Sequence, residues 1–253
     1  MRKAVVIFLL LMSFPIFLYL NFPLKRFVEN SLCHRKIFYK SVGVRKFPLK
    51  IEIEKLKISP LPFVFDKVVI VPEVRSFLAE KKELEVLATL GNKGALKIDT
   101  DYPISKVKFQ LKDLKLESFV GLFSLPFSVV GTLLGNGSLY LEKGNLMAGS
   151  GSFKVNDLKA EKISFGLLSL PSVDLGKIEG VYKVRGKNFL NVEAKGFGKD
   201  TDLFVKGYVN LNLKEMKKTY INLKIRLTPK VKPFKGKNFS FEIKGYLENI
   251  SIR

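Results

Sequence analysis

The chain has 253 residues and a formal net charge of +21, with 44 Lys and Arg against 23 Asp and Glu. It contains one Cys and one His, which excludes an intramolecular disulfide and a closed zinc site built from these ligands. The basic residues are spread along the chain and alternate with apolar ones, so they indicate the solvated side of a β-sheet and no nucleic-acid partner.

The first element in chain order is an apolar segment from Ala4 to Phe22, which holds 19 residues without a charge. A transmembrane helix needs about 20 predominantly apolar residues, so this segment predicts one membrane span with its ends at Ala4 and Phe22. A cleaved signal peptide is the alternative, but no small-x-small cleavage site follows the segment. Basic residues flank both ends of the span, so charge alone favours only weakly a cytoplasmic N-terminus.

Apolar residues at helical spacing after Pro23 predict a helix that leaves the membrane and ends near Tyr39. We therefore expect residues 1–41 to form a membrane anchor with a juxtamembrane helix. Residues 42–253 are expected to form a separate β-rich domain.

From Leu49 onward the apolar period changes to two, which predicts β-strands. The phase slips between Ile53 and Leu56, and this slip predicts a β-bulge or a bend. Further strands are expected over 63–71, 84–90, 95–98 and 106–116, with a hairpin turn at 91–94 and short helices over 73–82 and 117–125.

A short internal repeat follows, in which Gly135-Asn-Gly-Ser-Leu-Tyr-Leu141 is echoed by Gly149-Ser-Gly-Ser-Phe-Lys-Val155. A turn at 143–145 would make the two copies neighbouring strands of a meander. Glycines at matching heights would let the sheet bend or another backbone approach closely, although ordinary bulges and turns are an equal alternative. The candidate sheet-bending residues are Gly135, Gly137, Gly149 and Gly151.

The last third of the chain continues the period of two, with strands expected over 203–213, 221–227, 239–243 and 250–252. The segment 215–217 is expected to form a turn, and 228–238 a loop. No long soluble helix and no alternation of strands with helices is predicted. The fold class is therefore mainly β: a curved, mostly antiparallel sheet, as an open trough or partly closed barrel, with one or two short helices.

No motif in the chain points to catalysis. Neither Gly-x-Gly element is a dinucleotide fingerprint, because no third glycine follows at the required spacing. Cys33 and His34 are adjacent, so their side chains do not face each other. Glu52 and Glu54 match the outward phase of their strand and are expected on its solvated side. We predict a non-enzymatic protein with no catalytic residue, no metal site and no cofactor.

The pattern resembles protein N of the type II secretion system, the general secretion pathway N family. The resemblance lies in LKIEIEKLKISPLPFVFDKVVIVPEV at 49–74, LPFSVVGTLLGNGSLYLEKGNLMAGSGSFKVNDL at 125–158 and LFVKGYVNLNLKEMKKTYINLKIRLTPK at 203–230. It implies a non-enzymatic, single-pass component of the bacterial inner membrane, with its C-terminal domain in the periplasm. Its partners would be other secretion-system envelope proteins.

The same pattern of strands and glycines is similar to that of AsmA-like proteins, whose sheets form a trough that holds lipid. This similarity implies lipid binding or lipid transfer as an alternative function. A long sheet with one apolar face must cover that face, close on itself or bind a ligand, and few helices are predicted here to provide cover.

Overall fold

The computed structural model describes residues 21–35, 37–59, 61, 63–73, 82–91, 93–122, 128–165, 168–232 and 234–252. Within these residues, 14 strands form one sheet, and each strand is hydrogen-bonded to its neighbours in chain order. Every pairing is antiparallel, so the whole sheet is a single meander. The prediction of a mainly β, antiparallel fold is confirmed.

The strands are β1 (Ser41–Arg45), β2 (Lys50–Lys57), β3 (Val64–Pro72), β4 (Lys82–Leu90), β5 (Gly94–Tyr102), β6 (Lys106–Lys115), β7 (Ser128–Glu142), β8 (Asn145–Phe165), β9 (Leu168–Val184), β10 (Phe189–Phe197), β11 (Thr201–Asn210), β12 (Tyr220–Pro229), β13 (Phe239–Tyr246) and β14 (Asn249–Ile252). The helical segments are the α-helix α2 (Leu24–His34) and the 3₁₀ helices η2 (Leu116–Leu122) and η3 (Met216–Lys218).

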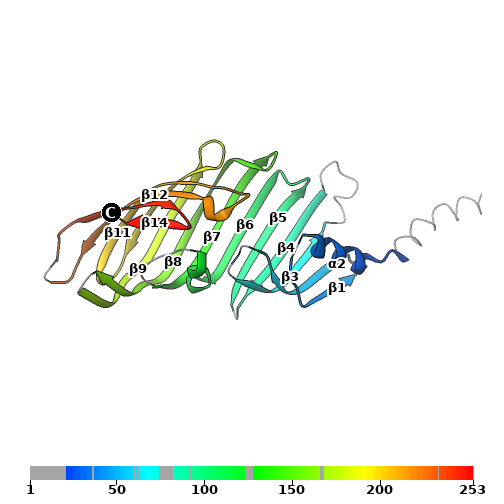
Figure 1. The fold of residues 1–253 in the computed structure, drawn as a ribbon, viewed down its shortest axis with the longest axis horizontal. Helices are drawn as coiled ribbons and strands as arrows, with labels where there is room; N and C mark the ends of the chain where they lie inside the picture. Colours follow the sequence, from blue (N-terminus) through cyan, green and yellow to red (C-terminus); the bar gives the residue numbers. More distant parts are fainter. Residues whose placement is uncertain are drawn as a thin grey trace, which may run out of the picture.

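The sheet is curved and does not close. β1 and β14 stand at opposite ends of the strand order, and no pairing joins them in the described part of the chain. In Figure 1 the strands follow one another along the long axis of the molecule, from α2 and β1 at one end, and the last strands are drawn across β9 and β11. The sheet is therefore curved and open, as expected for one of the two predicted shapes, and it does not form a closed barrel in the described residues.

Most of the expected turns and short helices form where the sequence places them. The hairpin at 91–94 joins β4 to β5 with Leu90 opposite Gly94, and η3 occupies the expected turn near Met216. The helix expected over 117–125 is η2. The helix expected over 73–82 lies almost wholly outside the described residues, and Lys82 begins β4.

Helix α2 is shorter than predicted. It ends at His34, and the backbone N–H of Ile37 returns to the carbonyl of Leu32 at 3.1 Å. Phe38 then forms a β-bridge with Lys57. Ile37 and Tyr39 pack against the buried cluster of β1–β4, so tertiary burial outweighs continuation of the helical period.

The strand expected over 203–213 is also shorter and ends at Asn210. The side-chain oxygen of Asn212 accepts hydrogen bonds from the backbone N–H groups of Lys214 and Glu215, at 3.1 and 2.9 Å. This local bonding satisfies the backbone in a turn and stops the strand, although the apolar alternation continues through Leu213.

The predicted phase slip in β2 is a bend. Lys55 has a left-handed φ of 51°, yet the register between β2 and β3 is the same on both sides of it. Asp113 and Asp157 have similar φ angles, of 51° and 53°, and there the register with the next strand does shift. Such interruptions let each strand keep its apolar residues on one side while the sheet curves.

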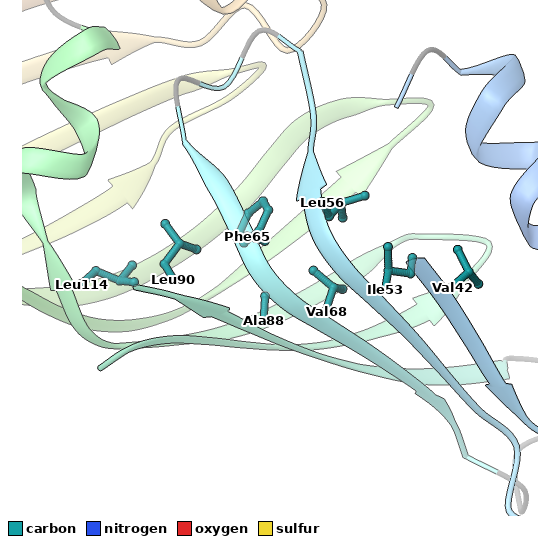
Figure 2. Close-up of a cluster of buried hydrophobic side chains, with 8 residues drawn as sticks. All are labelled: Val42, Ile53, Leu56, Phe65, Val68, Ala88, Leu90 and Leu114. Atoms are coloured by element: carbon teal, nitrogen blue, oxygen red, sulfur yellow. The ribbon is translucent and has the colours of Figure 1, made fainter. Parts of the chain in front are cut away.

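The two clusters of buried residues lie on one side of the sheet. Figure 2 shows one cluster whose side chains come from β1, β2, β3, β4 and β6 and project from the same face: Val42, Ile53, Leu56, Phe65, Val68, Ala88, Leu90 and Leu114. Val28 and Leu32 of α2 and Phe119 of η2 pack onto this cluster. A second cluster, on β8–β11, consists of Val155, Leu158, Ile178, Ala194 and Leu203.

Candidate functional site

One face of the sheet is apolar from β1 to β13. The registers place one residue of each strand in a continuous row, each opposite the next across the hydrogen-bonded pair. This first row consists of Val42, Ile53, Val68, Ala88, Leu96, Leu111, Gly135, Phe153, Gly180, Ala194, Val205, Ile225 and Phe241. None of these residues has a polar side chain, so the row is an uninterrupted apolar strip.

A second row runs beside the first on the same face. It consists of Val44, Ile51, Ile70, Val86, Ile98, Phe109, Gly137, Gly151, Tyr182, Val192, Gly207, Leu223 and Ile243. The hydroxyl of Tyr182 is the single polar group among these side chains. Every residue of this row is partly exposed to solvent. We call the two rows together the apolar face.

The opposite face carries the charge. Its neighbouring row includes Glu52, Lys97, Glu193, Lys206 and Lys224, which alternate in sequence with the apolar residues. Many of these charges are paired: Lys97 lies 2.6 Å from Glu85, and Glu52 accepts hydrogen bonds from Lys50 and Lys67 at 2.6 and 2.9 Å. We call this side the polar face.

These lysine contacts set the electrostatics of the polar face. Hydrogen bonds from Lys50 and Lys67 lower the pKa of Glu52 to about 2. Glu52 and Glu54 both follow the polar phase of β2, as the sequence predicts. Because ionised groups collect on one side of the sheet, the apolar face is left free of charge along both rows.

Glycines and aromatic rings share the floor of the apolar face. Gly137 and Gly151 are direct register partners, with Phe109 on one side of the pair and Tyr182 on the other. The rings of Phe109 and Tyr182 are nearly parallel, with centroids 6.3 Å apart and an angle of 12° between their planes. The two glycines therefore leave the space over the sheet that these rings occupy.

Tyr182 fills that space closely. A Cβ atom on Gly137 would overlap the Tyr182 hydroxyl, and one on Gly151 would lie 2.5 Å from it. The hydroxyl oxygen is buried and has no hydrogen-bond partner in the protein. Burial raises the pKa of Tyr182 to about 12. The side chain is therefore held neutral and flat against the backbone at physiological pH.

The other two predicted glycines lie on the same face but not opposite each other. Gly135 pairs with Phe153, and Gly149 pairs with Leu139. The part of the four glycines in bending the sheet stays a prediction. The register also places Phe109 and Tyr182 beside the glycines on the apolar face. The sequence alone does not reveal this, because alternation gives a residue's face and not its cross-strand partner.

Among the described residues, Leu116 of η2 packs onto the second cluster, and the other helical contacts lie at the β1 end of the apolar face. α2 packs there through Val28 and Leu32, and Phe63 lies 5.1 Å from Phe119 of η2, measured between ring centroids. Beyond these contacts the second row remains partly exposed across β5–β13. A partly exposed apolar strip of this length is unusual in a soluble monomer and typical of an interaction surface.

The remaining sequence-predicted sites do not form a group of reactive side chains among the described residues. The predicted span from Ala4 to Phe22 lies outside the described residues, except for its last two positions. In the part that is described, no helix is both long and apolar enough to cross a membrane. Cys33 is exposed, with its Sγ 3.9 Å from Tyr39 Oη. Among the described side chains, no group of three or more His, Cys, Asp or Glu could hold a metal ion.

Comparison of the chain with protein families, curated proteins and solved structures finds no match.

Proposed function

We propose that this chain is a non-enzymatic envelope protein that binds lipid acyl chains along its apolar face, in the manner of AsmA-like troughs. The observation that carries the proposal is the second row, which is apolar on every strand from β1 to β13 apart from one hydroxyl and is partly exposed throughout. Contact with hydrocarbon stabilises such a surface by about 25 cal/mol for each Å² of apolar area removed from water.

The dimensions suit several acyl chains. With 14 strands at a spacing of about 4.8 Å, the strip is roughly 60 Å long. That is about twice the hydrocarbon thickness of a bilayer, roughly 30 Å, to which each leaflet contributes one acyl-chain length. One acyl chain would cover only a few strands. Its binding would be favoured by about 0.8 kcal/mol for each methylene group that it buries.

The absence of charge on this face supports hydrocarbon and not headgroup binding. An ionised headgroup would find no counter-charge along the two rows, so it would remain at the rim of the sheet, in water. The predicted span from Ala4 to Phe22 would place the trough beside the inner membrane, with the β-domain in the periplasm. The protein would then meet membrane lipid through both its anchor and its sheet.

Site-specific photo-crosslinking in cells tests this proposal without relying on lipid that copurifies with the anchor. A photoreactive amino acid replaces Leu223, on the apolar face, or Lys224, the next residue and exposed on the polar face. Mass spectrometry of the crosslinked protein is expected to find lipid adducts at 223 and not at 224. Absence of lipid at 223, or equal labelling at both positions, contradicts the proposal.

A second candidate function is that of an accessory component of a type II protein secretion system. It is favoured by the resemblance to protein N and by the outer edge of β14, which pairs with no further strand among the described residues and so offers a place for strand addition by a partner. The two functions are compatible. Copurification with inner-membrane secretion proteins is expected; a deletion strain that still exports its exoproteins normally would count against this candidate.

A further inference from the structure

Four aromatic rings stand on the polar face, at one end of strands β10–β13. Phe189, Tyr208, Tyr220 and Tyr246 each come from a different strand. Successive ring centroids are 4.8, 6.3 and 5.4 Å apart. These rings lie on the opposite side of the sheet from the apolar face. Tyr246 is 51% exposed, and the other three are partly exposed.

Asparagines occupy the positions between the rings. In one row Asn210 pairs with Phe189 on one side and with Tyr220 on the other. In the adjacent row Tyr208 lies between Asn191 and Asn222. Aromatic and amide side chains therefore alternate in both directions across β10, β11 and β12, and Tyr246 of β13 extends the aromatic row beside Tyr220. In the described structure the amides of Asn191, Asn210 and Asn222 make no hydrogen bond to the protein, so their donors and acceptors are open to a ligand.

A cavity of about 350 Å³ adjoins this surface, between Tyr220, Tyr246 and the neighbouring turns. Its rim is fixed by two other asparagines. Asn188 accepts a hydrogen bond from the N–H of Leu146 at 2.7 Å, and Asn212 accepts from two backbone N–H groups of its own turn. The cavity volume falls at the lower end of the range typical of small-molecule sites, about 300–1,000 Å³.

We propose that this surface binds the pyranose rings of a glycan. Tyrosine rings offer apolar faces on which the C–H side of a sugar ring can stack, and each carries a polar hydroxyl at its edge. Asparagine amides both donate and accept, as sugar hydroxyls do, so the alternation of rings and amides matches the alternation of apolar and polar groups on a saccharide. Lys214, at the cavity, adds a site for an acidic substituent.

The proposed site is one for binding sugar. Glycoside hydrolysis generally uses a pair of carboxylic acids on either side of the scissile bond. The described lining of the cavity contains Asn, Lys, Tyr, Leu and Gly, but no Asp or Glu. A glycan site here would hold the protein to a saccharide of the cell envelope.

The test measures binding of the full-length chain, kept in a detergent without a sugar headgroup, to immobilised oligosaccharides of hexose, N-acetylhexosamine and uronic acid composition. Tyr246→Ala and Asn210→Ala alter the proposed site. Tyr140→Ala is the matched control, because Tyr140 is also on the polar face and is 48% exposed, against 51% for Tyr246. Circular dichroism of each variant verifies that the sheet is intact.

We expect saturable binding to at least one of the three classes, weakened about tenfold by Tyr246→Ala and by Asn210→Ala and unchanged by Tyr140→Ala. Retention of uronic acid oligosaccharides alone would identify an acidic glycan and still support the proposal. Failure to retain any class, or an equal loss in the Tyr140→Ala control, would overturn it. Because the site is on the polar face, this result is independent of the crosslinking at Leu223.

Discussion

The packing of Tyr182 over the paired glycines can be tested by a double-mutant cycle with Gly137→Ala and Tyr182→Phe. A methyl group at Gly137 would overlap the Tyr182 hydroxyl, with the carbonyl oxygen of Ser150 next at 2.9 Å and the ring Cζ at 3.0 Å. Inserting an atom into a filled space costs about 1–3 kcal/mol. Replacing glycine lowers the entropy of the unfolded chain and offsets about 0.4–1 kcal/mol of this cost. We expect a net loss of roughly 1–2 kcal/mol.

Tyr182→Phe alone is expected to stabilise the protein by about 1 kcal/mol, because the buried hydroxyl it removes has no hydrogen-bond partner. In the Tyr182→Phe background, the nearest atom to the new methyl group is gone and the two others remain. Gly137→Ala should then cost roughly 1 kcal/mol less than in the wild type. Urea titration of the full chain in a mild detergent, followed by far-ultraviolet circular dichroism, measures all four free energies of unfolding. If Gly137→Ala costs the same in both backgrounds, within about 0.3 kcal/mol, the ring does not lie over Gly137.

Three further predictions concern titration and turn chemistry. Although partial burial acts in the opposite direction, hydrogen bonds from the backbone N–H groups of Lys106 and Ser105 and from the Ser105 hydroxyl lower the pKa of Asp101 to about 2. The pKa of an Asp side chain in the unfolded chain is about 3.9, so this stabilisation is present above about pH 4 and is lost as the pH falls toward 2. Asp101→Asn should therefore reduce the dependence of the free energy of unfolding on pH between about pH 4 and pH 2. An unchanged dependence in this variant would refute the assignment. Burial raises the pKa of Tyr182 to about 12, so the free energy of unfolding should fall between about pH 10 and pH 12. A Tyr182→Phe variant whose free energy of unfolding falls equally over this pH range would contradict this reasoning. Lys143 and Gly144 form the two-residue turn between β7 and β8, with φ angles of 48° and 75°. Because Asn tolerates this left-handed conformation better than Lys, Lys143→Asn should raise the free energy of unfolding by roughly 0.5–1 kcal/mol. Urea titration measures this difference.

The sequence determines the strands and the face on which each side chain lies. Alternation along β6, β11 and β12 specifies both, because successive side chains of a strand point to opposite sides. The turn glycines at 91–94 and 143–145 fix two of the hairpins for the same local reason. The errors lie where tertiary contacts compete with local pattern, as at the end of α2, where burial of Ile37 and Tyr39 outweighs the helical period.

The pattern of each strand, taken alone, does not determine what faces what across the sheet. Phe109 and Tyr182 are far apart in the chain, and only the registers of β6–β9 bring their rings onto one pair of glycines. The same is true of Tyr208, which comes between Asn191 and Asn222 only after β10, β11 and β12 have paired. Alternation repeats every two residues, so it leaves the register between strands open by any even shift. That choice is made by the packing of the whole sheet, where turn geometry, bulges and the fit of rings over glycines act together.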